Sequence, residues 1–260
     1  MRENLRKYEL SHQKNIRDFG GLKTNDGRHI KYGRLFRGGA FGKIDEEDIK
    51  ILTSLHLTDI VDFRSEKEFF AHPDRRLKGV EYHSFPAIRE TIKIENTNYE
   101  DGNLLWFVHD DETGFTHLKK QYEELVTIEE SVTAYKNFFK VILQDDKVTY
   151  FHCSQGKDRA GLASFLIETA LGVSFEDALE DYLYSNIAMK SRVEKIKEEI
   201  KNKSFYNEEY EKSLYAVFSA KEEYLRASIE TMNEVYGGVI PFLENILEVD
   251  IKRLKDLYLE

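Results

Sequence analysis

The residues His152-Cys153-Ser154-Gln155-Gly156-Lys157-Asp158-Arg159-Ala160-Gly161 decide how this chain folds, because they join two apolar segments through a short polar loop. Residues 148–151, which precede the loop, have the composition of a buried strand, and residues 162–171, which follow it, that of an apolar helix. Cys153 is the only cysteine of the chain, and five residues separate it from Arg159. A strand, a glycine-containing loop and a helix in this order predict an α/β fold with an anion site at the loop.

The chemistry of an anion site explains the residue types in this loop. A loop of this length can curl so that its N–H groups point inward, and the helix N-terminus adds partial positive charge at the same point. Arg159 offers a planar fork for two phosphate oxygens, and a Cys153 thiolate there could attack phosphorus and form a cysteinyl-phosphate that water hydrolyses. We therefore predict catalytic roles for Cys153 and Arg159. Phosphate binding is expected from the loop positions Ser154, Gln155, Gly156, Lys157 and Ala160.

A simpler interpretation of the same residues is that they carry no chemistry. A lone cysteine at the end of a strand is often a small buried hydrophobe, and loop charges are often only solvated. However, Lys157 and Arg159 place two cations at the positive end of the predicted helix, where they oppose its dipole. A bound anion accounts for both of them.

The motif His-Cys-x-x-Gly-Lys-Asp-Arg resembles the signature of the bacterial atypical tyrosine phosphatases of the mycobacterial tyrosine phosphatase B type. Further segments resemble the same family, so that the match spans nearly the whole chain: residues 15–21, 35–40, 62–68 and 224–237. The resemblance implies a cysteine-dependent phosphatase acting on phosphotyrosine, on phosphoserine and phosphothreonine in some members, and on phosphoinositides. It also implies that Lys157 helps to bind a second phosphate of an inositol ring.

One position departs from the family. The family usually has Thr or Ser directly after the loop arginine, where this chain has Ala160. In the family that hydroxyl is thought to stabilise the cysteine as a leaving group when the phosphoenzyme breaks down. Ala160 therefore predicts a slow second step, and it keeps an alternative open: a substrate-trapping pseudophosphatase that binds phosphate with little turnover. The intact Cys153 and Arg159 favour the active enzyme.

The general acid is not decided by the sequence. A departing alkoxide or phenoxide needs a proton, which a carboxylic acid usually gives. Asp158 lies within the loop, and Asp62 follows a predicted strand, whose C-terminal end would lie at the ligand-binding edge of a parallel sheet. We predict these two as the catalytic candidates about equally. Asp110 and Asp111, in an irregular stretch, are weaker candidates and are better interpreted as solvated loop charges.

Two other arginines are candidates for substrate binding. Arg37 and Arg64 each follow a short apolar segment, at what would be the end of a strand. Both are predicted to line the pocket and hold substrate phosphate or acidic side chains. By contrast, Arg17 and Asp18 are interpreted as part of a structural turn with the two glycines that follow.

Length and composition fit one domain spanning residues 1–260, which the resemblance implies is a phosphatase domain. Hydrophobic residues make up 41% and the net charge is −10, which disfavours nucleic acid as a partner. A single cysteine excludes a disulfide framework or multi-cysteine zinc site, and we expect no metal and no cofactor. The N-terminus lacks the apolar core of a signal peptide and no stretch resembles a membrane span, so a cytoplasmic location is expected, with export by another route left open. The expected partner is a phosphorylated protein or a phosphoinositide.

The predicted fold class is α/β, a cysteine-phosphatase-like, mostly parallel sheet flanked by helices. Strands are predicted at residues 29–32, 35–37, 60–63, 80–85 and 148–152. Helices are predicted after Asp45, over residues 117–143, from the catalytic loop to Gly172, and after Ser174. Residues 187–220 are charged and helical with scattered aromatic side chains, most of which we expect to pack against the core. The family resemblance implies the alternative that this segment forms a helical lid over the site.

Overall fold

The computed structural model describes residues 7–11, 13, 15–87, 111–201 and 207–260 of the chain. A six-stranded sheet has the strand order β1-β2-β3-β6-β4-β5. Its strands are β1 (Lys7–Tyr8), β2 (Ile16–Asp18), β3 (Leu35–Gly39), β4 (Asp59–Asp62), β5 (Glu81–Ser84) and β6 (Thr149–Cys153). β3, β6, β4 and β5 are parallel, whereas β2 and β1 extend the sheet in antiparallel fashion. The mostly parallel sheet predicted from the sequence is therefore confirmed.

Strand β6 lies in the middle of this sheet, between β3 and β4, and all five of its residues are buried. A strand covered on both faces is expected to be continuously apolar, as Tyr150 and Phe151 indicate. Cys153 at its end lies opposite Gly39 of β3, and His152 lies opposite Asp62 of β4. The C-terminal ends of three parallel strands thus meet at one edge, which is where α/β sheets bind ligands.

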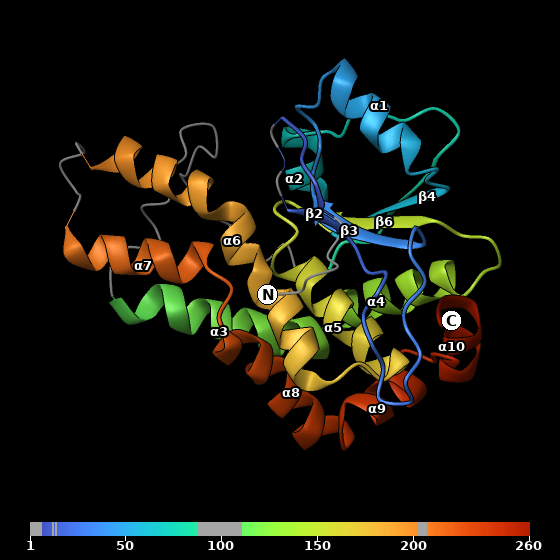
Figure 1. Ribbon diagram of the computed structural model, residues 1–260. Helices are drawn as coiled ribbons and strands as arrows, with labels where there is room; N and C mark the ends of the chain where they lie inside the picture. The colour runs from blue at the N-terminus through green and yellow to red at the C-terminus, as the bar shows by residue number, and fades with distance from the viewer. Residues whose placement is uncertain (1–6, 12, 14, 88–110, 202–206) are drawn as a thin grey trace.

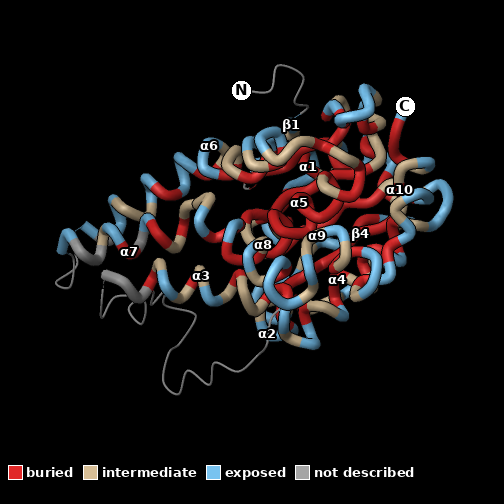
Figure 2. Tube along the Cα trace, turned by 90° about the horizontal axis from the view of Figure 1, so that it is seen from below, coloured by how far each residue is buried: buried red, intermediate tan, exposed pale blue. Residues whose placement is uncertain are grey.

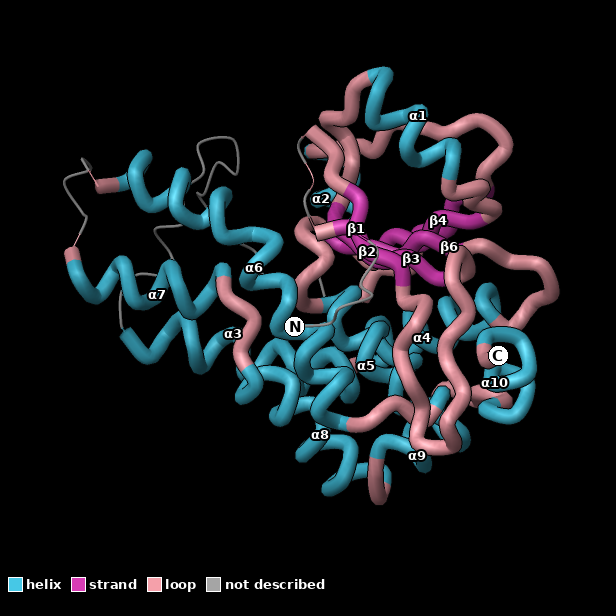
Figure 3. Tube along the Cα trace, in the orientation of Figure 1, coloured by secondary structure: helices cyan, strands magenta, loops and turns pink. Residues whose placement is uncertain are grey.

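Helices cover both faces of the sheet (Figures 1 and 3). One face carries α1 (Glu46–Ser54) and α2 (Glu66–Ala71). The other carries α4 (Glu129–Ile142), α5 (Arg159–Leu171) and α10 (Ile251–Tyr258). Each face buries its own apolar cluster, the larger one between the sheet and the second set of helices.

Helix α5 starts directly at the end of the predicted anion loop and runs into the larger apolar cluster (Figure 2). Most of its residues are apolar and only Thr169 is not buried, as expected for a helix enclosed within a core. The helix ends at Gly172, whose φ of 88° is the left-handed conformation that glycine adopts readily. The start of this helix is therefore held firmly beside β6.

The helices α3 (Asp111–Thr127), α6 (Phe175–Ile200) and α7 (Glu208–Phe218) extend to one side of the sheet in Figure 1. Both α7 and α8 (Glu222–Tyr236) pack against α3. The chain then forms the short helix α9 (Val239–Pro241) and a π-helical turn at Phe242–Ile246 before α10. None of the helices in the described part of the chain has the length and apolar character needed to cross a membrane.

Several predicted helix boundaries are confirmed. Asp45 caps α1 in a reciprocal capping box with Asp48. Ser174 caps α6 by accepting from the Asp177 backbone N–H. The predicted strand at residues 35–37 is the start of β3, and the predictions at 60–63, 80–85 and 148–152 each overlap a strand within one or two residues.

Three predictions about secondary structure were wrong. Residues 29–32 form no strand of the sheet, and only His29 and Ile30 make isolated bridges, with Lys23 and Leu259. Arg17 lies in β2, not in a turn, because β2 finds its hydrogen-bond partners in the distant β1 and β3. The single helix expected at residues 117–143 is two helices, α3 and α4, which are separated at Ile128, where the backbone is extended.

Candidate active site

Cys153 ends β6 and Arg159 begins α5, so the five-residue loop between them closes at the C-terminal edge of the sheet. Cys153 itself is buried, with an exposed fraction of only 2%. Gly156 has a φ of 69°, and a Cβ there would lie 2.2 Å from the Gly38 carbonyl. Only glycine fits this position, because the left-handed backbone and the close approach to β3 both exclude a side chain.

The loop arginine is held by a carboxylate that the sequence analysis did not select. Glu68, on α2, accepts from Arg159 through both oxygens, with Nη1–Oε2 at 2.6 Å and Nη2–Oε1 at 2.8 Å. The Ser154 hydroxyl also donates to Glu68 Oε1, at 2.5 Å. Burial alone would raise the pKa of Glu68, but the charge and hydrogen bonds of Arg159 and the Ser154 hydroxyl lower it to about 2. Glu68 is therefore an acceptor that orients the Arg159 fork.

Asp158 is the N-cap residue of α5, but its side chain makes no capping hydrogen bond. Its Oδ1 accepts from the Tyr122 hydroxyl at 2.9 Å, and Tyr122 in turn shares a hydrogen bond of 2.7 Å with the Tyr182 hydroxyl. Burial and the nearby Asp158 carboxylate raise the pKa of both tyrosines well above the usual value, so both stay protonated. About a quarter of the Asp158 side chain remains exposed, which leaves it accessible from solvent.

Lys157 does not project into solvent. It is 2% exposed, and its ammonium group donates to the carbonyl oxygens of Val217 and Ser219, which lie at the end of α7 and just beyond it. The Ser219 contact is 3.3 Å long, and the Asp158 carboxylate lies 3.4 Å away. The loop is thereby tied directly to the helix expected to belong to the lid.

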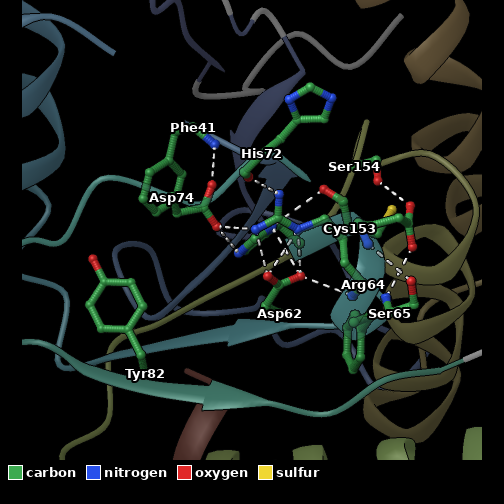
Figure 4. A network of polar contacts seen from close by, with 12 residues as sticks. Phe41, Asp62, Arg64, Ser65, His72, Asp74, Tyr82, Cys153 and Ser154 are labelled. Atoms are coloured by element: carbon green, nitrogen blue, oxygen red, sulfur yellow. Dashed lines mark hydrogen bonds and ion pairs between the residues drawn. The ribbon is translucent and has the colours of Figure 1, made fainter. Parts of the chain in front are cut away.

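Asp62 and Arg64 form a buried cluster behind the loop (Figure 4). Arg64 binds both oxygens of Asp62, at 2.7 to 3.0 Å, and also reaches Asp74 at 2.6 Å. The pKa of Asp62 lies below its ordinary value because the charges of His152 and Arg64, with the Arg64 hydrogen bonds, outweigh the effect of burial. Asp62 is thus a paired carboxylate without a proton to give, and the 2% exposed Arg64 does not line an open pocket.

Arg37 also lies away from solvent, contrary to the predicted position. Its side chain is fully buried behind the loop, where Nη1 contacts Asp181 Oδ2 at 2.8 Å and Nη2 donates to the Gly156 carbonyl at 2.8 Å. Ala160 is fully buried in the first turn of α5. Gln155 contacts Asn15 through its backbone carbonyl. Asp110 and the side chain of Asp111 lie outside the described residues.

Within the part of the chain that the structure describes, two groups of side chains have metal-ligand types and spacing: Asp62, Asp74 and His152, and separately Asp59, Glu81 and His83. A cation already lies within each group. Arg64 bridges Asp62 and Asp74, and Lys147 lies 3.0 Å from Asp59. The carboxylates are therefore neutralised by the chain itself, and the donor sets do not favour a metal ion.

The residues that sequence reasoning missed are Glu68, Tyr122 and Asp181. A local signal existed for Glu68, because Ser65 and Glu68 have the spacing of a capping box, which α2 indeed forms. That signal places the carboxylate on a helix start but does not reveal its contact with Arg159. Tyr122 contacts Asp158 of the loop from α3, whereas Asp181 on α6 contacts Arg37, which in turn donates to the Gly156 carbonyl. No spacing in the sequence indicates either contact.

The sequence of this chain matches a family model and several named proteins. A family model described as "Tyrosine phosphatase family" matches residues 8–260. A Cupriavidus necator protein named "Putative tyrosine-protein phosphatase" is 28% identical over 264 residues, covering 94% of this chain and 85% of its own. The "Triple specificity protein phosphatase PtpB" of Mycobacterium tuberculosis is 24% identical over 280 residues, covering 96% of this chain and 98% of its own. Among solved structures, the catalytic domain of the PP-IP phosphatase SIW14 from S. cerevisiae is 11% identical with a TM-score of 0.37, covering 74% of this chain and 95% of its own.

Proposed function

Since the chain belongs to the tyrosine phosphatase family, we propose that it hydrolyses phosphomonoesters, phosphotyrosine first among them, through a cysteinyl-phosphate on Cys153. The observation that carries this proposal is the position of Cys153 at the end of β6, with Arg159 at the start of α5 and a left-handed Gly156 between them. This arrangement presents N–H groups, a helix N-terminus and a guanidinium to one oxyanion.

In the first step the Cys153 thiolate attacks phosphorus, an S–P bond forms, and the ester P–O bond breaks with its electron pair leaving on the substrate oxygen. Arg159 and the loop N–H groups stabilise the negative charge on the other phosphate oxygens. In the second step water attacks phosphorus, the S–P bond breaks and the thiolate is regenerated with release of inorganic phosphate. These two steps require no reactant other than the phosphate ester and water.

We assign the proton donor of the first step to Asp158. It lies next to Arg159, keeps solvent access, and is oriented by the Tyr122 hydroxyl. After giving its proton to the departing oxygen, Asp158 accepts one from the attacking water. Asp62 is the weaker candidate, because Arg64 binds both of its oxygens and keeps it ionised.

The substrate range is proposed to extend to phosphoserine, phosphothreonine and phosphoinositides, as the printed name of the mycobacterial relative suggests for that protein. Binding of a second inositol phosphate by Lys157 would require its ammonium group to exchange the Val217 and Ser219 carbonyls for the ligand. We propose that residues 187–220 act as a lid and that this exchange accompanies its opening.

A second candidate function is a phosphate-trapping protein with little turnover. Ala160 supports it, because the position after the arginine lacks a hydroxyl. The two candidates share the first step and differ in the rate of the second.

Phosphate release from an aryl phosphate, followed with excess EDTA in wild type and in Cys153→Ser, tests the proposal. Steady release by wild type and none by the variant is the expected result. A single burst that matches the enzyme concentration would favour the trapping protein. Equal release by both would reject a cysteine mechanism.

A further inference from the structure

Asp181, on α6, is a carboxylate enclosed between two arginines from neighbouring strands. Arg17 of β2 contacts it through Nε at 2.8 Å, and Arg37 of β3 contacts its other oxygen through Nη1, also at 2.8 Å. The arginine side chains are fully buried and that of Asp181 is 3% exposed. Two cations brought this close inside a protein repel each other unless an anion lies between them.

The same two arginines lead to the catalytic loop. Arg37 donates through Nη2 to the Gly156 carbonyl at 2.8 Å and reaches the Lys157 carbonyl at 3.4 Å. Arg17 donates to the Asn15 side-chain oxygen at 2.8 Å, and the amide nitrogen of Asn15 donates to the Gln155 carbonyl at 3.0 Å. Three consecutive loop carbonyls are therefore held from the side of β2 and β3.

Holding the carbonyls determines where the N–H groups point. In a trans peptide the C=O of one residue and the N–H of the next are directed to opposite sides. With the carbonyls of residues 155–157 turned toward Asn15 and Arg37, the N–H groups of residues 156–158 are directed away from them. An oxyanion site depends on N–H groups that point away from these partners and toward the ligand, and this orientation must exist before the ligand binds.

We infer that Asp181 and Arg37 are positioning residues for the phosphate loop: Asp181 fixes the two arginines, which fix the loop carbonyls and thereby orient the oxyanion-binding N–H groups. Neither residue is a direct phosphate ligand. The inference rests on the proposed phosphatase function and deepens it, because it assigns the conformation of the loop to charges outside the signature motif.

The test measures binding of inorganic phosphate without turnover, as the protection of Cys153 from alkylation by iodoacetamide. Asp181→Asn is expected to raise the Kd for phosphate by at least about tenfold, because oriented donors are lost. Asp59→Asn is the matched control: Asp59 is also a buried carboxylate with polar partners that include Lys147 and the His83 ring, but it lies at the N-terminal end of β4, away from the loop. It should lower stability and leave the phosphate Kd unchanged.

A second variant covers the case in which Asp181→Asn does not fold. Arg37→Lys keeps a cation beside Asp181, but a single ammonium group lacks the fork that spans Asp181 and the Gly156 carbonyl. This variant should raise both the Kd for phosphate and the KM for substrate, while the thermal midpoint of unfolding changes little. If the folded variants bind phosphate with the wild-type Kd, the positioning role is wrong, but the proposed phosphatase function is not affected. A wild-type protein in which phosphate does not protect Cys153 would instead overturn the proposed function.

Discussion

Glu68 and Arg159 form a two-point ion pair in which each guanidinium nitrogen, Nη1 and Nη2, meets its own carboxylate oxygen, at 2.6 and 2.8 Å. The pair joins α2 to the first residue of α5 across the loop, and the Ser154 hydroxyl completes it. These two contacts fix the plane of the guanidinium, so that its remaining N–H donors point in one direction. Arg159, the proposed catalytic arginine, is therefore positioned by a residue 91 positions earlier in the chain.

Glu68→Gln should lower kcat by roughly 10²-fold, because a misplacement of about 1 Å in a catalytic group has an effect of this size. Glutamine keeps the length of the side chain and an oxygen for the α2 cap, but not the second charged contact. Steady-state kinetics on an aryl phosphate measure the loss. Glu66→Gln, an exposed change on the same helix turn, is the control and should leave kcat unaltered.

The same pair predicts a pH dependence of stability. The pKa of Glu68 is about 2 in the folded protein against 4.5 ordinarily, so on acidification the unfolded chain takes up this proton first. Its stabilisation is complete above about pH 4.5 and is lost as the pH falls toward 2. Urea unfolding of wild type and Glu68→Gln should give free energies that converge as the pH falls below 4.5. A difference that stays constant there would contradict the assignment.

Asp158→Asn should slow hydrolysis of alkyl phosphates by about 10²–10⁴-fold, the usual contribution of a general acid. An aryl phosphate with an activated leaving group should lose much less, since its oxygen departs without a proton. Asp62→Asn should show no such dependence on the leaving group, because the carboxylate of Asp62 is ion-paired with Arg64. Equal losses on both substrates in Asp158→Asn would indicate a binding role instead.

Lys157→Met should loosen the end of α7, because the ammonium group that binds the Val217 and Ser219 carbonyls is removed. Faster amide hydrogen exchange around residues 215–220 is the expected result, with little change in α5. Lys212→Met serves as the control, since that lysine is 63% exposed on α7 and pairs with the exposed Glu208 of the same helix. Unchanged exchange in Lys157→Met would show that this contact does not hold the helix.

Ala160→Ser should raise kcat if breakdown of the phosphoenzyme limits turnover, since a hydroxyl at this position can stabilise the departing thiolate. Serine is preferred to threonine because Ala160 is fully buried and an extra methyl group would overpack the turn. Rapid-mixing experiments should show a smaller burst and a faster steady rate. An identical steady rate would mean that the second step does not depend on this hydroxyl.

The parts of the fold that depend on local pattern were predictable from the sequence. Strand β6, the loop and α5 follow from apolar segments on either side of a glycine-containing loop, and the caps at Asp45 and Ser174 follow from neighbouring residues. Strand β2 was not, because its three residues are defined by pairing with distant strands rather than by their own composition.

The contacts between charged residues were not predictable for a related reason. Arg37 and Arg64 are ordinary cations in the sequence, and only the fold shows that buried carboxylates bind both of them. The partner of Arg37, Asp181, lies 144 positions away. A charge pattern at that separation carries no signal in a single sequence, so the sequence predicts Cys153 and Arg159 as the nucleophile and its arginine but not the residues that contact them.

In the proposed mechanism the phosphoryl group of the substrate is transferred to Cys153 before it reaches water. Rapid acid quench of wild type during turnover of an aryl phosphate, followed by peptide mass mapping, tests this transfer. We expect one phosphoryl group on the peptide that contains Cys153, and none on that peptide in Cys153→Ser. Phosphate on another residue, or steady turnover by Cys153→Ser, would contradict it.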